Sequence, residues 1–532
     1  MNLLTKPLKA FVRWCLSIAR SKDSFDSAKS AIVAVTILGI WLTIVIFTAT
    51  RHEFWRDEVR ALSFARDAIS PLDLYELTQY EGHPILWYLL LYVGKSIVDT
   101  QLILPVMSIS VAFAAVVIFM FFSPFPLWFR WLFIFSALPF YEYSVMARNY
   151  GISMLLMFIC AVIYRNRGKY PLLLAFVLAL LANTNVHSAI LVCLIAALWA
   201  CDTIFEQRTA SVRGWGLSLY LSFAIVFAGV LLCAVFTMPR ESTIVTNVYD
   251  ISVRDLSYAF VEAASQPGQT FHALMPRVPP LVVGLLLYLA VFGLLHLHRP
   301  NLVLAALGSL IAFGVFFRVV YGGWYRHQGL FLVFLLFLYW LFIESLNNDR
   351  AINRKKYLLS YTGLYVAMST LIFWNVAKAT VTVWKDISVE MSSSKAFGEF
   401  LNTSETYRDA IIVPEPDFLL ESLPYYAKNR IYIPREHRFG TTASWTTEAN
   451  YRLSLGELLS LASDLKTRFD QPVLIVLGHW DFYKYEHREK KYSYNKVFTW
   501  NTDEFADFNR LTIPVTKFWS IGDENYRVYA IR

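Results

Sequence analysis

Five charged side chains lie directly after the first long apolar run of the sequence. The run AIVAVTILGIWLTIVIFTAT ends at Thr50, and the segment EFWRDEVR follows at 53–60. A carboxylate at a membrane edge, partly desolvated and close to arginines, can act as a general base toward a hydroxyl. Asp57 and Glu58 are therefore candidate catalytic residues. The alternative is a surface cluster in which they pair with the neighbouring arginines.

Four polar groups of the sequence interrupt or border apolar runs. They are WRDE (55–58) with EGHP (81–84), EYSVMARNY (142–150), NTNVH (183–187) and GWYRH (323–327). Ionisable groups at membrane depth cost free energy unless they pair or serve a site. Alternation of the helices across the membrane places the four groups at one face, so we expect them to form a common site.

The residue types in these groups suit transfer of a group from a lipid phosphate to a polar acceptor. Arginine binds phosphate bidentately, so Arg148 and Arg326 are predicted to hold the phosphate, together with the adjacent His327. The residues predicted to contact the rest of the substrate are Trp55, His83, Tyr150, His187 and Tyr325. Taken singly, each has a simpler interpretation as a packing residue, a helix cap or flank, or an arginine that extends to the headgroups. Their joint placement favours a site.

The composition indicates a polytopic α-helical membrane protein. Hydrophobic residues make up 56% of the chain and charged residues 17%, where soluble domains carry about 25% charged residues. The apolar residues are gathered into runs near the helix-spanning length of about 20 residues. The net charge of +8 comes from basic residues in short loops, as in cytoplasmic loops, and indicates no nucleic-acid partner. The five cysteines indicate neither a disulfide framework nor a cysteine metal site.

The distribution of basic residues predicts the topology. Residues 1–30 form a basic cytoplasmic segment before a signal anchor, and four further basic loops are expected in the cytoplasm at 165–169, 202–213, 296–299 and 349–356. Later helices are expected at 171–185, 187–201, 215–237, 281–297, 301–320, 328–343 and 357–377. The early half has one crossing too many, and the runs at 84–98 and 127–143 are the suspected short or re-entrant segments. In all, about 11–13 transmembrane or re-entrant helices are expected, with external loops at 51–83 and 238–280.

A soluble α/β domain is predicted for residues 385–532. AIIVPEP (410–416), RIYIP (430–434), VLIVLG (473–478) and YRVYAI (526–531) have the pattern of buried strands. DFLLESLPYYAK and SLGELLSLASDLKTRF have helical spacing. Alternation of strands and helices indicates a mostly parallel sheet. No phosphate-binding glycine motif supports nucleotide binding.

The succession FWRDEVRALSFARD, YEGHPILWYLLL and YEYSVMARNYGISMLLMF resembles the type C glycosyltransferases. The similarity covers about residues 30–345 and is greatest to the branch of protein O-mannosyltransferases, lipid A aminoarabinose transferases and rhizobial core-oligosaccharide transferases. It implies that residues 31–380 form a transmembrane glycosyltransferase domain. It also implies an acidic catalytic residue in the first external loop, which falls on Asp57 as general base, with Glu58 beside it. From their position beside this pair, we expect Arg56 and Arg60 to keep Asp57 ionised.

The resemblance further implies a polyprenyl-phosphate sugar donor, surrounding membrane lipid, and a glycan, lipid or protein acceptor. The protein is then a multi-pass protein of the inner (cytoplasmic) membrane, with the active site and the C-terminal domain on the extracytoplasmic side. Some members use a divalent metal ion and others do not; Asp57, Glu58 and His83 are the candidate ligands here. Two other classes stay open: a transporter or flippase of lipid-linked sugars, and a non-catalytic envelope assembly protein.

Overall fold

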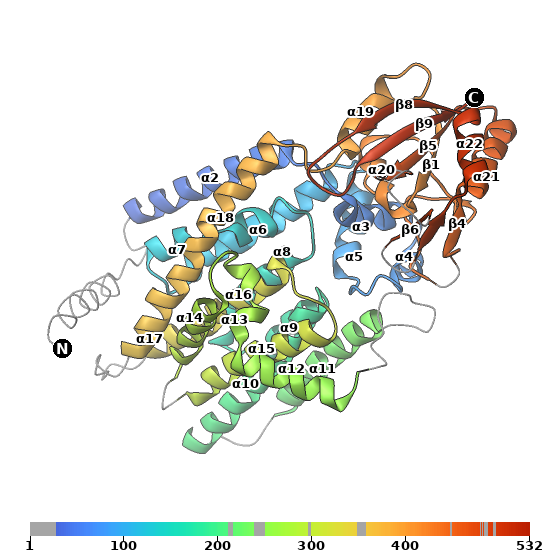
Figure 1. Ribbon diagram of the computed structural model, residues 1–532. Helices are drawn as coiled ribbons and strands as arrows, with labels where there is room; N and C mark the ends of the chain where they lie inside the picture. The colour runs from blue at the N-terminus through green and yellow to red at the C-terminus, as the bar shows by residue number, and fades with distance from the viewer. Residues whose placement is uncertain are drawn as a thin grey trace.

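The computed structural model describes residues 28–210, 216–238, 251–295, 299–347, 358–446, 449–478, 480, 482, 488–492 and 496–532. The basic segment expected at 1–30 lies almost entirely outside these residues, as does the basic loop expected at 349–356. The described residues form a helical part and a C-terminal α/β domain that adjoin each other (Figure 1).

Seven helical segments of the described residues are long and apolar enough to cross a membrane. They are α2 (Ala28–Arg51), α6 (Ile103–Phe122), α10 (Val186–Ala210), α11 (Leu217–Thr237), α15 (Pro300–Val319), α16 (Tyr325–Asn347) and the continuous α17 (Leu358–Thr362), η5 (Gly363–Met368) and α18 (Ser369–Ser388). Four shorter apolar helices are α5 (Leu86–Ile97), α8 (Tyr150–Tyr164), α9 (Pro171–Ala182) and α14 (Pro280–Phe292). The seven long segments and four shorter helices together reach the lower end of the 11–13 transmembrane or re-entrant helices expected. They confirm a multi-pass helical membrane protein.

The helices differ in how much of their surface is covered by protein. In α16, 78% of the spanning window is buried, whereas the value is 28% for α2 and for α11. A helix that is apolar on all sides and buried belongs at the centre of a bundle. The exposed side chains of the outer helices are also apolar, as with Ile32 and Phe227, and this is the surface that lipid requires.

The two suspected segments are indeed short. The run at 84–98 forms α5, which has 12 residues. The run at 127–143 is divided into α7 (Leu127–Ile134) and the π-helical turn η1 (Leu138–Glu142), which contains Pro139. The expected loop at 51–83 is folded into α3 (Arg56–Asp67) and α4 (Pro71–Thr78). Described parts of the 238–280 loop form α12 (Val253–Ser265), α13 (Pro267–Thr270) and η3 (His272–Leu274).

The C-terminal domain begins after α18, so the expected boundary at 385 falls inside that helix. Its main sheet has the order β1–β5–β9–β8, formed by Ile411–Glu415, Val473–Gly478, Tyr526–Ile531 and Thr512–Phe518. Only the β1–β5 pair is parallel, in the register Ile411 with Val473, and the other two pairs are antiparallel. The expectation of a mostly parallel sheet is therefore wrong, because the missed strand β8 forms a hairpin-like pair with β9.

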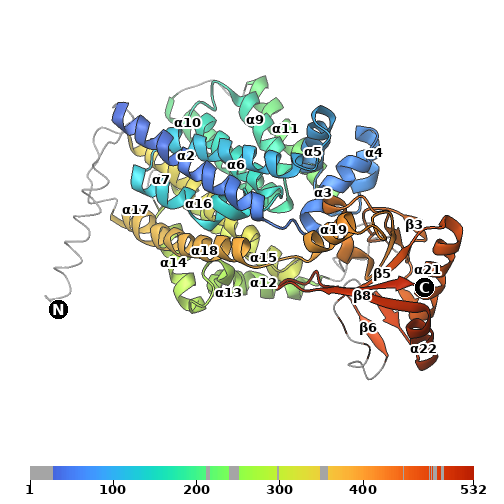
Figure 2. The ribbon, with the colours of Figure 1, turned by 90° about the horizontal axis from the view of Figure 1, so that it is seen from above.

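Helices cover both faces of this sheet (Figure 2). They are α19 (Ser394–Thr403) on one face, and α21 (Leu455–Phe469) and α22 (Thr502–Leu511) on the other. β1 and β5 are buried along their whole length, which explains their uninterrupted apolar sequences. The small strands are β2 (Tyr432–Ile433), β3 (Arg438–Phe439), β4 (Arg452–Ser454), β6 (Glu489–Lys491) and β7 (Val497–Thr499). The helix expected in DFLLESLPYYAK is divided into η6 (Asp417–Leu420) and α20 (Leu423–Tyr426).

Candidate active site

Asp57 lies in the first turn of α3, between the helical part and the C-terminal domain. The N-terminus of a helix favours a carboxylate, because its unpaired N–H groups carry partial positive charge. The Asp57 Oδ2 atom accepts a hydrogen bond from Nη1 of Arg148 at 2.5 Å. The Asp57 side chain is 39% exposed and that of Arg148 is 13% exposed. The carboxylate is thus both paired and accessible.

Arg148 belongs to an irregular turn, residues 143–149, between η1 and α8. Irregular backbone among apolar helices needs internal hydrogen bonds, and the hydroxyl of Ser108 in α6 donates to two carbonyl oxygens of the turn, at 2.8 and 3.4 Å. Gly151 permits the close return of the chain, because a Cβ atom there would lie 2.5 Å from the carbonyl oxygen of Tyr143. The turn is therefore held rigidly.

Hydrogen bonds join this turn to three other polar groups of the sequence. Donor first, they run from Ala147 N–H to Glu58 Oε1 at 2.7 Å, from Asn149 Nδ2 to the Thr184 carbonyl at 2.6 Å, and from Tyr143 Oη to the Arg326 carbonyl at 2.7 Å. Segments around positions 58, 147, 184 and 326 therefore meet in one polar cluster, as expected from their placement along the sequence.

Arginines keep Asp57 ionised. Burial disfavours the charged carboxylate, but Arg148, Arg56 and Arg326 outweigh this effect and lower the pKa of Asp57 from 3.8 to about 2. An opposite charge a few ångströms away stabilises the charged form of a carboxylate. The site therefore combines one accessible carboxylate with several guanidinium groups.

Arg326, in the first turn of α16, is the least committed of these arginines. Its Nε atom is buried and has no hydrogen-bond partner among the described residues. Its guanidinium carbon lies 5.7 Å from the centre of the Trp55 ring, which is half-buried. The next residue, His327, accepts the Trp324 N–H through Nδ1 at 2.9 Å and is buried against the rings of His187 and Tyr150, so the expectation that it holds the phosphate is not supported. Arg326 could bind a phosphate without first losing an ion pair.

Glu58 does not share the accessibility of Asp57. Its side chain is fully buried, and its two oxygens accept the Ala147 N–H, the Trp55 N–H at 3.3 Å and the Nε2 contact of His52 at 3.1 Å. The expectation that Glu58 is catalytic is therefore corrected. Its buried carboxylate accepts hydrogen bonds from backbone N–H groups and cannot reach a substrate.

Three predicted substrate contacts are also interior packing residues. Tyr150 stacks on the Tyr143 ring at 6.0 Å. Tyr325 donates its hydroxyl to Asn375 of α18. His187 is stacked on the His327 ring at 4.9 Å, and its ring nitrogens have no partner among the described residues. All three side chains are buried, so their direct contact with substrate is not supported.

His83 is half-buried and follows Gly82, whose φ of +66° shapes the turn before α5. Burial, aided by the charge of Arg148, lowers the pKa of His83 to about 4, so the ring is neutral. No group of three or more histidine, cysteine or acidic side chains among the described residues could hold a metal ion. The suggested ligand set of Asp57, Glu58 and His83 does not fit, because Glu58 is committed to the bonds above.

Arg60 points toward the C-terminal domain rather than toward Asp57. Its Nε and Nη2 atoms donate to Glu81 at 2.7 and 2.6 Å, and Nη1 donates to Glu421. A further bond runs from Nη2 to the Ala443 carbonyl at 2.9 Å. The expectation that Arg60 keeps Asp57 ionised is therefore wrong. Arg60 instead joins α3 to the α/β domain and to the EGHP segment.

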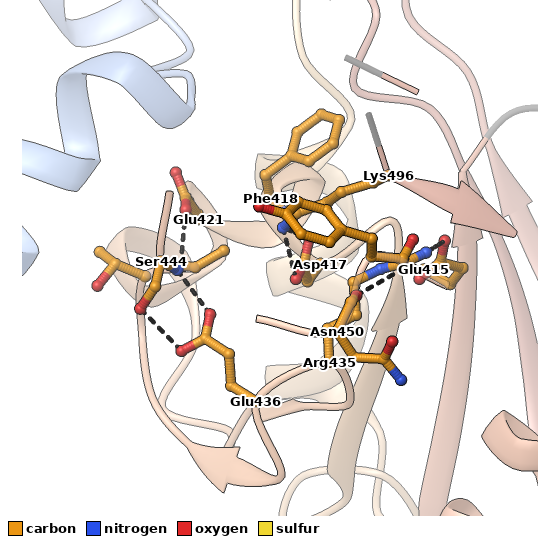
Figure 3. Close-up of polar contacts among 12 residues, drawn as sticks. Glu415, Asp417, Phe418, Glu421, Arg435, Glu436, Ser444, Asn450 and Lys496 are labelled. Carbon is orange, nitrogen blue, oxygen red and sulfur yellow. Dashed lines mark hydrogen bonds and ion pairs between the residues drawn. The ribbon is translucent and has the colours of Figure 1, made fainter. Parts of the chain in front are cut away.

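Buried ion pairs fix the part of the domain that receives Arg60 (Figure 3). Arg435 donates to Glu415 at 2.5 Å, and Lys496 donates to Asp417 at 2.8 Å, all four side chains being buried. Glu421 follows on the same segment, after η6, and also accepts the Ala443 N–H at 2.8 Å. The docking point for α3 is therefore rigid.

A hollow of about 390 Å³ opens on the other face of α3, lined among others by Val59, Ser63, Arg66 and Lys95. At 3.6 residues per turn, the α3 residues Val59, Ser63 and Arg66 face away from Asp57. The hollow is therefore separate from the Asp57 site.

Residues of the site that the sequence did not single out include His52 and Asp386, which bond to each other at 2.9 Å. Each lies at the end of an apolar run beside another charged residue, and that placement is the signal that could have singled them out. The pairing of His52 with Asp386 joins residues 334 positions apart, so it depends on the fold and not on any local sequence pattern.

Comparison with known proteins finds similarity to solved structures. No protein-family model and no curated protein matches the chain. The crystal structure of ArnT from Cupriavidus metallidurans in the apo state superposes with a TM-score of 0.49 and 12% identity, covering 95% of this chain and 98% of that chain.

Proposed function

We propose that the protein is a membrane glycosyltransferase that moves a sugar from a polyprenyl-phosphate donor to an acceptor hydroxyl. The observation that carries the proposal is the accessible Asp57 carboxylate, paired with Arg148 at 2.5 Å and close to the uncommitted Arg326. The resemblance of the sequence to type C glycosyltransferases supports the same conclusion. The site and the C-terminal domain would face the extracytoplasmic side of the inner membrane.

The proposed reaction is a single displacement. The acceptor oxygen attacks the anomeric carbon and gives its proton to Asp57, while the bond from that carbon to the phosphate oxygen breaks. The bonding electrons leave with the polyprenyl phosphate, whose added negative charge is stabilised by Arg148 and Arg326. Attack from the face opposite the leaving group inverts the anomeric centre.

Donor binding would also activate the base. A carboxylate with a pKa near 2 is a weak base at neutral pH, because general bases work best when their pKa is close to the working pH. A donor phosphate that binds Arg148 competes with Asp57 for the guanidinium. Since burial alone raises the pKa of Asp57, loss of this partner makes the carboxylate more basic when the substrate is in place.

The test is transfer by Asp57→Asn in liposomes that contain polyprenyl-phosphate sugars and the envelope acceptor. We expect the variant to insert and fold but to form no glycosylated product, because the amide cannot accept the proton. Asp99→Asn is the matched control, since Asp99 is 68% exposed and, among the described residues, is paired with Arg66 at 3.6 Å; the variant should keep wild-type turnover. Wild-type turnover by Asp57→Asn would end the proposal.

A further inference from the structure

A histidine bridges two buried carboxylates beside the proposed active site. The Nδ1 atom of His52 lies 2.9 Å from Asp386, and its Nε2 atom lies 3.1 Å from Glu58. His52 directly follows α2, Glu58 is in α3, and Asp386 is in the last turn of α18. All three side chains are buried, so none of them can touch a substrate directly. The bridge joins three elements that are far apart in the sequence.

The geometry favours a protonated His52. A neutral imidazole has one N–H donor, whereas both ring nitrogens here lie within hydrogen-bond distance of a carboxylate. Burial disfavours the charged ring, but Glu58 and Asp386 outweigh it and raise the pKa of His52 to about 10. Among the described residues, the aromatic rings of Phe54 and Tyr141 also pack against His52, with ring centres 4.9 and 6.1 Å away, and neither ring is a cation.

The bridge is directly connected to the Asp57–Arg148 pair. Glu58 accepts the Ala147 N–H at 2.7 Å, and the residues next to these two, Asp57 and Arg148, bond at 2.5 Å. Two consecutive residues of α3 are thus linked to two consecutive residues of the turn. A change in the orientation of Glu58 must move the backbone that carries Arg148, and with it the geometry around Asp57.

We propose that His52 is a positioning residue: held by Asp386, it locks the Glu58 carboxylate and thereby fixes the Asp57–Arg148 pair in reactive geometry. This proposal rests on the proposed function, since it assigns the network a task in that reaction. A displacement of about 1 Å in an active site can cost about 100-fold in rate. Loss of the bridge therefore lowers the rate of the chemical step more than it lowers donor binding, which depends on arginines that remain present.

The experiment compares Glu58→Ala, Glu58→Gln and Asp386→Asn in the full chain in liposomes. The maximal rate per folded molecule and the KM are measured with polyprenyl-phosphate sugars extracted from producing cells, and binding is measured with a short-chain polyprenyl phosphate. We expect Glu58→Ala to lose about 100-fold in kcat with KM and phosphate binding nearly unchanged. Glu58→Gln keeps an oxygen for the Ala147 N–H and should lose less, and Asp386→Asn should lose kcat in the same sense.

Asp202→Asn is the matched control for burial. Asp202 is also a buried acid, bonded to Arg299, Asn301 and Tyr164, but it lies in a cluster separate from Asp57. The Asp202→Asn substitution should lower the stability of the protein and leave kcat per folded molecule unchanged. The proposal is overturned if folded Glu58→Gln and Asp386→Asn both keep the wild-type kcat. It is also overturned if Asp202→Asn loses as much kcat as they do. Both tests apply even if Glu58→Ala fails to fold.

The outcome is separable from that of the proposed function. If Asp57→Asn is inactive while the Glu58 and Asp386 variants keep wild-type kcat, only the positioning role is wrong. If Asp57→Asn is active, the proposed function itself is wrong.

Discussion

At the scale of single residues, His52 links the stability of the protein to pH. Its pKa rises from 6.5 to about 10 in the folded state, so folding is coupled to retention of a proton. The stabilisation is complete below about pH 6.5 and is lost as the pH rises through about 10. We expect the unfolding temperature of the full chain in detergent to fall over this range, and to fall less in His52→Gln, which has no imidazole to titrate. Identical pH dependence in the two proteins would contradict a charged bridge.

The sequence predicted Asp57, Arg148 and Arg326 as site residues because charged residues at the edges of apolar runs are unusual. The residue pattern alone did not separate Asp57 from Glu58, and only the resemblance placed the general base at Asp57. Adjacent residues of a helix point about 100° apart, so one carboxylate of the pair faces the accessible side and the other is buried. Which of the two carboxylates is buried depends on packing against the turn at 143–149. The sequence around position 58 carries no information about that turn, which lies far away along the chain.

At the scale of elements, α3 is held from two sides. The helical part binds it through Glu58 and Asp57, and the C-terminal domain binds it through Arg60 and Glu421, with Arg56 bonded to Asp523 at 2.6 Å. The C-terminal domain therefore lies beside the site and also helps to position Asp57, the proposed base.

The two arginines Arg60 and Arg66 on α3 allow a matched test of this docking. Arg60→Ala leaves Glu81 and Glu421 buried without their cation, and breaking a buried pair costs about 3–5 kcal/mol. Among the described residues, Arg66 is paired with the exposed Asp99 at 3.6 Å, and exposed pairs contribute about 0–1 kcal/mol. Thermal unfolding in detergent should show a much larger loss for Arg60→Ala than for Arg66→Ala. Equal losses would contradict the docking role of Arg60.

Regular elements were easier to predict than irregular ones. The runs at β5 and β9 match the observed strands residue for residue, because buried strands leave an uninterrupted or alternating apolar pattern. The edge strand β8 was missed, since most of its side chains are not buried and Pro514 interrupts it. The turn that carries Arg148 was expected only as a polar interruption, because EYSVMARNY (142–150) borders apolar runs and its irregular backbone leaves no regular pattern in the sequence.

At the scale of the whole molecule, the two-part architecture was predictable from hydropathy alone, whereas the convergence of the polar groups needed the topology as well. The meeting of Asp57 with Arg148 and of His52 with Asp386 depends on how the helices pack, and spacing along the chain does not encode it. The unexpected result at this scale is that the C-terminal domain bonds to α3, and that α18, the last described membrane helix, bonds to His52 just before α3. The proposed site is thus assembled from nearly the whole length of the chain.

The most direct test of the central claim is a structure of the full chain in nanodiscs with a short-chain polyprenyl phosphate bound. The expected result is a phosphate held by both Arg148 and Arg326, with Arg148 drawn away from Asp57 and the carboxylate facing the vacated sugar position. A phosphate bound elsewhere, with the Asp57–Arg148 pair intact and Arg326 still without a partner, would contradict the claim.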